Sequence, residues 1–222
     1  MVIAIMAIIG AGGVALVSFG SGKQQLVTAQ QTMMSMFEEA RILASSKNAR
    51  ARVLIYRGDD PARKLRQVGV IYEAYDENGN NLGWVANSAP IMLPKGVYYV
   101  PPSGEFKTFA KVADDFNEAE MIYSTFRSGM TGSPDVVGMT DFSRRPQSVG
   151  EGNGEWYSYE FSPEGLSENP SAGIIVAAAT MNNKGELIVD NPYNILGFVV
   201  LRTGRTVGFT DYSEIKGNLR TD

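Results

Sequence analysis

The sequence predicts an α+β fold: a long N-terminal α-helix, membrane-spanning in its first half, packed on an antiparallel β-sheet domain. Three observations lead to this prediction. No proline precedes Pro61, and the apolar residues before position 50 recur with helical spacing. After Ala51 the apolar residues alternate with the period of a β-strand. Segments rich in asparagine and glycine then separate pairs of these strands, as in β-hairpins.

The N-terminal residues 1–22 form the first predicted unit, the transmembrane half of the helix. No charge precedes Lys23, and residues 2–19 are apolar except for one serine. This length approaches the ~20 apolar residues that a helix needs to cross a bilayer. Two alternatives stay open: a buried core helix, and a cleaved secretory signal, although no basic segment precedes the apolar run. The predicted membrane-helix residues are Val2, Ile3, Ile5, Ile8, Ile9, Val14, Leu16, Val17 and Phe19.

Residues 23–50 form the second predicted unit, an amphipathic continuation of the same helix. Residues 23–48 contain neither proline nor glycine, and apolar side chains repeat every seven positions in two registers. One helix over residues 2–49 would be roughly 70 Å long, more than a domain of this size can cover. We therefore expect neighbouring copies to share an apolar stripe, although a helix lying on its own sheet is an alternative. The predicted assembly stripe is Leu26, Ala29, Met33, Met36, Ala40 and Leu43.

Residues 51–222 form the third predicted unit, a globular β-rich domain. Hairpin turns are expected around Asn78-Gly79, at residues 182–185 and at residues 202–205. We expect a short helix at residues 114–126, and a long loop at residues 128–153, which are rich in glycine, serine and proline. The predicted strands cover residues 52–56, 64–75, 82–86, 97–100, 156–161, 174–180, 186–189, 198–201 and 206–209.

The composition points away from catalysis. The 222 residues include no cysteine and no histidine, which excludes thiol nucleophiles and removes the commonest general base at neutral pH. The formal net charge of −4 argues against a general nucleic-acid binder. We therefore expect no catalytic residue, no cofactor and no metal, and we do not expect nucleic acid as a partner. A serine–lysine hydrolase stays open in principle, but no pattern favours one.

Two local patterns suggest binding chemistry only weakly. Asp76, Asn78 and Asn80 have the spacing of the first ligands of a calcium loop. However, Asn81 replaces the required glycine and Asn87 replaces the bidentate glutamate, so we interpret the segment as a turn. The C-terminal end is locally basic, a weak indication of nucleic-acid binding that rests on Arg202, Arg205, Lys216 and Arg220.

Four short segments resemble type IV pilin-like proteins. Residues 2–8 resemble the membrane half-helix of that family, and residues 37–46 resemble the place where this helix turns polar and enters the domain. Residues 159–165 resemble the family's F-x-P-x-G turn, and residues 200–207 resemble its T-G-R turn. Within the family the chain is most similar to the minor pseudopilins of type II secretion, the H component (GspH), and to FimT-like minor pilins.

The resemblance implies a pilin-like structural subunit rather than an enzyme. Such a subunit is held in the cytoplasmic (inner) membrane by one helix, with its globular domain on the periplasmic side. N-terminal helix packing assembles it into a type II secretion pseudopilus or a type IV pilus. The implied partners are other pilin or pseudopilin subunits, the inner-membrane assembly platform and the lipid bilayer. The alternative function is a membrane-tethered envelope module that captures DNA or a secreted substrate.

The N-terminal part of the family pattern has no counterpart in this sequence. The family carries a basic leader, a glycine cleaved before an N-methylated aromatic residue, and a glutamate five residues further on. This sequence begins inside the apolar run. We therefore expect the genomic sequence immediately upstream to encode such a leader in frame, which would make a prepilin peptidase a further partner.

Overall fold

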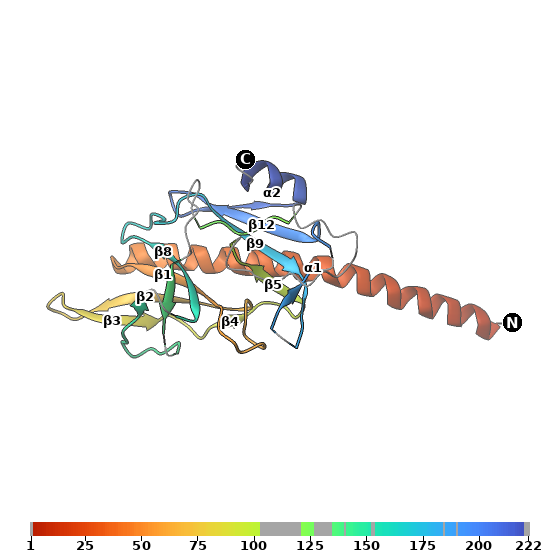
Figure 1. The fold of residues 1–222 in the computed structure, drawn as a ribbon, viewed down its shortest axis with the longest axis horizontal. Coiled ribbons are helices and arrows are strands. Elements are labelled where there is room, and N and C mark those ends of the chain that lie inside the picture. The colour runs from red at the N-terminus through yellow and green to blue at the C-terminus, as the bar shows by residue number, and fades with distance from the viewer. Residues whose placement is uncertain are drawn as a thin grey trace.

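The computed structural model describes residues 2–102, 121–126, 135–139, 141–151, 154–183, 185–189 and 191–219. The side chains of residues 2–21, 151 and 219 lie outside this description. The predicted α+β fold is confirmed: a long N-terminal helix packs on antiparallel β-sheets (Figure 1).

The helix α1 covers Val2–Lys47, 46 residues. Figure 1 shows its N-terminal part projecting from the body, while its C-terminal part lies along the sheets. The helix ends two residues before the predicted limit because Asn48 adopts the left-handed conformation, with a φ of 48°. The Ala49 N–H then donates to the Ala44 carbonyl at 3.1 Å, which is the bond of a Schellman cap.

Two antiparallel sheets form the body. The strands of the seven-stranded sheet are β1 (Ala51–Tyr56), β2 (Gln67–Tyr75), β3 (Asn81–Ala86), β4 (Ile91–Met92), β6 (Val136–Gly138), β7 (Gly150–Glu151) and β8 (Trp156–Phe161). The four-stranded sheet contains β5 (Val97–Val100), β9 (Ala172–Ala178), β12 (Ile195–Val200) and β13 (Thr206–Phe209), and β10 (Thr180–Met181) pairs separately with β11 (Leu187–Ile188). The strand orders are β3-β2-β1-β8-β6-β7, with β4 also on β2, and β13-β12-β9-β5.

The main core joins α1 to both sheets. The helix contacts β1, β2 and β8 of the larger sheet and β5, β9, β12 and β13 of the smaller one. Phe37 lies at the centre, with its ring centroid 5.3 Å from that of Tyr159 on β8 and 5.3 Å from that of Phe198 on β12. Such aromatic contacts add to the stabilisation that the buried apolar area supplies. The helix therefore joins the two sheets, which also meet directly where the hydroxyl groups of Tyr99 on β5 and Tyr159 on β8 lie 2.6 Å apart.

A second core lies on the other face of the larger sheet. Along β1 the side chains of Val53 and Ile55 enter the main core, whereas those of Leu54 and Tyr56 enter the second core. The segment that follows β6 returns to β3, where the Trp84 N–H donates to the Gln147 carbonyl at 2.8 Å and the Trp84 carbonyl accepts a bond from the Gln147 N–H at 3.0 Å. This segment covers the second core.

The loop predicted at residues 128–153 is therefore partly wrong. Its described residues include β6 and β7, which pair with each other, and β6 also pairs with β8. Both strands are too short to produce an alternating pattern in the sequence. Phe142 anchors the segment against Gly69, where a Cβ atom would lie 2.2 Å from its Cε1. Tertiary packing, rather than local preference, gives this segment its structure.

Some of the other predicted elements are confirmed and others are wrong. The first and third hairpins are confirmed as β2–β3 and β12–β13. The second turn joins β10 to β11, whereas the strand expected at residues 174–180 is Ala172–Ala178 and pairs with β12 and β5. The helix expected at residues 114–126 is absent from residues 121–126, and the rest of it lies outside the described residues. The terminal helix α2 (Tyr212–Leu219) was not expected from the sequence.

One buried polar side chain fastens α1 to the edge of the smaller sheet. Gln30 is 9% exposed, and its Nε2 donates to the Gly197 carbonyl at 2.6 Å and to the Phe209 carbonyl at 2.8 Å. These carbonyls belong to β12 and β13. Both acceptors would lose this donor if the amide were removed, and unmet hydrogen bonds of this kind are costly.

We expect Gln30→Ala to lower the free energy of unfolding by about 1–3 kcal/mol, because it removes two buried hydrogen bonds between α1 and the smaller sheet. Gln31→Ala is the matched control: Gln31 is exposed, so its change should stay within about 0.5 kcal/mol. Urea unfolding followed by circular dichroism measures both. Equal stability of the two variants would contradict the role assigned to the Gln30 amide.

Candidate functional site

The predicted assembly stripe lies inside the chain's own core. Leu26, Ala29, Met33, Ala40 and Leu43 are each 8% exposed or less, and Met36, which is half-buried, packs against the same core. These side chains are not accessible to a second copy. The alternative from the sequence, a helix lying on its own sheet, describes them correctly. The heptad spacing did not distinguish the two because both surfaces use the same apolar periodicity.

The face of α1 opposite the predicted assembly stripe is exposed to solvent. Between Lys23 and Glu38 the helix carries no charged residue at all. A solvated helix face normally carries charges, so an uncharged face of this length is suited to contact with another protein surface. Ile42, further along, is 52% exposed. The exposed residues of this outward face are Lys23, Gln24, Gln25, Thr28, Gln31, Ser35, Ile42, Ser45, Ser46 and Lys47.

Three hydroxyl groups on the outward face are hydrogen-bonded to the helix itself. The Thr28 Oγ1 donates to the Gln24 carbonyl at 2.9 Å, and the Ser46 Oγ donates to the Leu43 carbonyl at 3.2 Å. The Ser45 Oγ likewise bonds to carbonyls one turn earlier. A polar group that keeps a partner loses less when water is removed from it. A neighbouring helix could therefore cover these hydroxyls without leaving their donors unpaired.

Three of the segments that carry the pilin resemblance meet in space. Gly165 of the F-x-P-x-G turn and Gly204 of the T-G-R turn have φ values of 77° and 76°. A Cβ atom at Gly204 would lie 2.3 Å from the Gly165 carbonyl oxygen and 2.7 Å from the Arg41 Cδ of α1. Glycine is required here by both backbone conformation and close approach. The two turns therefore pack against the C-terminal part of α1.

A shallow depression lies beside this junction, between α1 and the start of β13. Its volume is about 330 Å³. A hydrogen bond from Arg41, opposed in part by burial, lowers the pKa of Glu38 at its rim, and the Arg205 charge lowers it further. Glu38 is therefore a carboxylate at neutral pH, and the rim carries both signs of charge. The depression is lined by Met34, Ser35, Glu38, Arg205 and Thr206.

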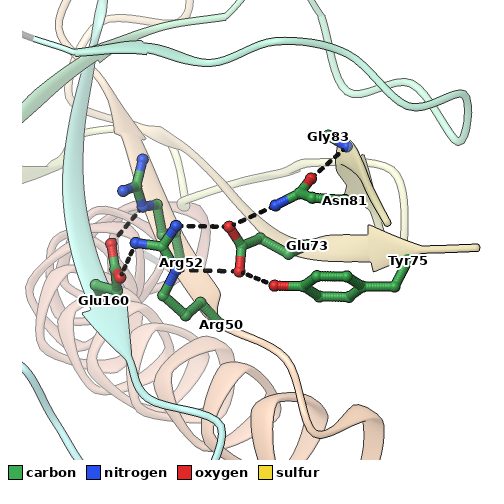
Figure 2. Close-up of polar contacts among 7 residues, drawn as sticks. All are labelled: Arg50, Arg52, Glu73, Tyr75, Asn81, Gly83 and Glu160. Atoms are coloured by element: carbon green, nitrogen blue, oxygen red, sulfur yellow. Dashed lines mark hydrogen bonds and ion pairs between the residues drawn. The ribbon is translucent and has the colours of Figure 1, made fainter. Parts of the chain in front are cut away.

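A network of charged side chains forms a second polar site, shown in Figure 2. Arg50, just after α1, binds Glu73 on β2 through Nη2–Oε1 and Nε–Oε2 contacts of 2.6 and 3.0 Å. Its Nη1 also reaches Glu160 Oε1 on β8 at 3.2 Å. Arg52 on β1 contacts Glu160 Oε2 at 2.6 Å, and its guanidinium lies 4.3 Å from the Trp84 ring centroid. The network joins three strands to the end of the helix.

Glu73 is saturated with hydrogen bonds. It is 2% exposed, and besides Arg50 it accepts bonds from the Tyr75 hydroxyl at 2.9 Å and the Asn81 Nδ2 at 3.1 Å. Burial alone would raise the pKa of Glu73, but the bonds from Arg50, Tyr75 and Asn81 outweigh burial and lower it. The bond to Glu73 likewise raises the pKa of Arg50. A carboxylate with all its acceptor positions in use acts as a clamp, not as a general base.

Sequence reasoning missed this network, although a signal was present. Arg52, Glu73 and Glu160 each interrupt a strand that is otherwise mostly apolar or aromatic. A charge within a buried strand needs a partner, because an isolated buried charge is very costly. The partners could not be named from sequence, since Arg52 and Glu160 become neighbours only through the β1–β8 register.

The calcium-like segment is a turn, as interpreted from the sequence. Asp76 Oδ1 accepts bonds from the N–H groups of Asn78 and Asn80 at 2.9 and 2.8 Å. Its carboxylate is thus used by its own turn. Within the described residues, no three carboxylate side chains are gathered as metal ligands would be. Of the predicted basic residues, Arg202, Arg205 and Lys216 are exposed, and Arg220 lies outside the description.

Among the residues whose side chains are described, no helix is both long enough and apolar enough to cross a bilayer.

The predicted membrane-helix residues lie at the N-terminal end of α1, and their side chains are outside the described part, so their insertion into a membrane stays a prediction. The backbone of this segment is helical and continuous with the part that packs on the body. The nine residues concerned are Val2, Ile3, Ile5, Ile8, Ile9, Val14, Leu16, Val17 and Phe19.

Comparison with protein-family models, with curated proteins and with solved structures finds no match for this chain. The class is therefore defined by architecture: an N-terminal helix packed on antiparallel β-sheets, consistent with a pilin-like α+β fold. The resemblance to pilin-like proteins rests on short motifs, three of which the structure brings into contact at Arg41, Gly165 and Gly204.

We expect Glu73→Gln to lower the free energy of unfolding by roughly 2 kcal/mol at pH 7, because it weakens charge-assisted hydrogen bonds. The folded-state pKa of Glu73 is lowered, so its contribution is complete above the ordinary value and is lost as the pH falls through the folded pKa. The difference between wild type and variant should therefore shrink in acid. Urea unfolding at several pH values measures it.

Glu77→Gln, on the same hairpin and exposed, is the matched control and should change stability by less than about 0.5 kcal/mol. A wild type–Glu73→Gln difference that stays constant down to the lowest pH would show that the Glu73 charge does not stabilise the fold.

Proposed function

We propose that this protein is a minor pilin- or pseudopilin-like structural subunit, anchored in the inner membrane by the first half of α1 and assembled by N-terminal helix packing. The fibre is a type II secretion pseudopilus or a type IV pilus. The partners are other pilin or pseudopilin subunits, the assembly platform and the bilayer. The globular body lies on the periplasmic side.

The observation that carries the proposal is the length of α1 relative to the body. The helix has 46 residues, yet its first buried side chain in the described part is Leu26. The residues before Lys23 carry no charge and are mostly apolar. Leaving them in water would cost about 25 cal/mol for each Å² of exposed apolar surface. Lipid tails or the helices of neighbouring subunits remove that cost.

Exchange between lipid and a fibre is nearly balanced for such a helix. Lipid tails solvate apolar side chains about as well as other apolar helices do, so hydrophobicity alone does not drive the transfer. Packing and polar contacts decide it instead. The outward face of α1 supports this role, because it lacks charge between Lys23 and Glu38 and the hydroxyls of Thr28, Ser45 and Ser46 bond to the helix itself.

We expect the full chain to sediment with membranes and to resist a high-salt wash, whereas deletion of residues 2–21 should release it. The truncated body should keep the thermal unfolding midpoint of the full chain, because the buried residues begin at Leu26. Cell fractionation with immunoblotting, followed by thermal circular dichroism, measures both. Recovery of the full chain in the soluble fraction would defeat the anchoring proposal.

Paired charges on the outward face test the assembly surface. Gln24→Glu with Gln31→Glu places two charges seven residues apart on this face at exposed, near-isosteric positions. We expect incorporation into sheared fibres to fall by about tenfold or more, because an unpaired charge is costly to bury. The matched control is Ser213→Glu with Lys216→Gln, which makes the same change in net charge on α2.

Immunoblots of sheared fibres from cells that make the assembly machinery measure incorporation, and circular dichroism checks that both proteins fold. The control should assemble as the wild type does. If the Gln24 and Gln31 variant assembles equally well, the outward face of α1 is not the shared surface.

A further inference from the structure

We infer that the free edge of β13 is a strand-addition site for an extended segment of a partner polypeptide, whose side chains enter the depression between α1 and β13. Three observations carry this inference: the direction of the backbone groups on β13, the contrast with the other sheet edges, and the position of the depression. The partner would pair through its main chain, as in known forms of β-augmentation.

The ladder register defines which groups of β13 are free. Val199 faces Val207 in the β12–β13 ladder, and the Leu201 N–H donates to the Arg205 carbonyl at 2.8 Å. Antiparallel pairs alternate between hydrogen-bonded and non-hydrogen-bonded, so the backbone groups of Thr206 and Gly208 point away from β12. In the described part of the chain, β13 is the edge of its sheet, with no strand beyond it.

Two of the other sheet edges in the described residues, those of β3 and β5, are covered. The outer edge of β3 bonds to the segment after β6, through Trp84 with Gln147 and through the Ala86 N–H with the Ser143 carbonyl at 2.8 Å. At β5, the Tyr99 N–H donates to the Leu65 carbonyl at 2.8 Å. By contrast, Thr206–Phe209 contains no proline and no charge, the usual protections of an exposed edge.

The depression lies where a strand added to β13 would place its side chains. Gly208 faces α1, since a Cβ atom there would lie 3.3 Å from the Met34 Sδ, and Thr206 and Met34 both line the depression. Alternate side chains of an added strand would therefore lie over α1. The flexible thioether of Met34 adapts to apolar groups of varied shape. On the other face, Val207 is 45% exposed and offers a second apolar contact.

The occupant is a partner polypeptide and not a second copy of this chain. Two β13 strands pairing antiparallel about a twofold axis would point the two α1 helices in opposite directions, because α1 runs along the strands of this sheet (Figure 1). Both N-terminal halves could not then enter the same membrane or the same fibre in parallel. The choice of a partner polypeptide over a second copy rests on the proposed function. The observation that the edge of β13 is free does not depend on that function.

A lysine-capped, fluorescein-labelled peptide of alternating threonine and leucine is the probe, added to the full chain in mild detergent. We expect saturable binding and slower hydrogen exchange at the Thr206 and Gly208 amides. A peptide with the same side chains, but methylated at its central amide nitrogens, should not bind, since it cannot pair along a strand edge. Equal binding of the two peptides, or no binding of either, would overturn the inference.

Two variants of the chain complete the test. Thr206→Pro removes the outward N–H and should weaken binding by at least about tenfold, the loss expected for a hydrogen bond of about 1.4 kcal/mol. Thr206→Val keeps that N–H and should bind as the wild type does. If Thr206→Pro unfolds, hydrogen exchange at the Gly208 amide of the wild type decides the question. It is measured once with the unmethylated peptide and once with the methylated peptide.

The oligomeric state separates this inference from the proposed function. Size-exclusion chromatography with light scattering should show that Thr206→Pro leaves the state of the chain unchanged. A dimer of wild type that Thr206→Pro dissociates would place a second copy on the edge and overturn the choice of partner. Membrane fractionation and fibre incorporation are measured in separate assays. If the chain does not anchor in membranes, the result of the peptide-binding experiment is unaffected.

Discussion

The burial of one face of α1 against two sheets is the interaction on which the rest of the structure depends. The helix contributes to the core of both sheets: Phe37 contacts aromatic rings from β8 and from β12, and the Gln30 amide donates to carbonyls of β12 and β13. Without the helix each sheet would expose an apolar face. The helix therefore cannot turn about its axis or shift along the body without opening the core, and this rigidity determines which of its faces is left for other molecules.

The same constraint connects the body to the proposed assembly. Because the inner face of α1 is occupied by the core, the proposed contact with neighbouring subunits uses the outward face. There the side chains are uncharged over several turns, and the hydroxyls of Thr28 and Ser46 bond to their own helix. The glycine turns at Gly165 and Gly204 pack against Arg41 in the C-terminal part of the helix. They also set the position of β13, so the assembly face, the depression and the free strand edge lie side by side on one flank of the molecule.

The polar residues show how far reasoning from sequence reaches. The turn at Asp76 was predictable because its bonds are local, made within four residues by its own carboxylate. The clamp of Arg50, Glu73 and Glu160 was not, because its partners are separated by 23 and 110 positions and meet only through strand register. The short strands β6 and β7 escaped prediction for a related reason: they are stabilised by contacts with β8 and with each other, not by local preference.

The sequence by itself determined the class of fold, the continuous helix, the first and third hairpins and the absence of cysteine and histidine chemistry, because periodicity, turn residues and composition act over a few neighbouring positions. Only the tertiary structure decided which face of α1 is buried, since a heptad of apolar residues serves equally well against the chain's own sheets or against another helix. It also decided which strand edge is free, because an edge is defined by the strands that do not lie beside it, and that is a property of the whole sheet.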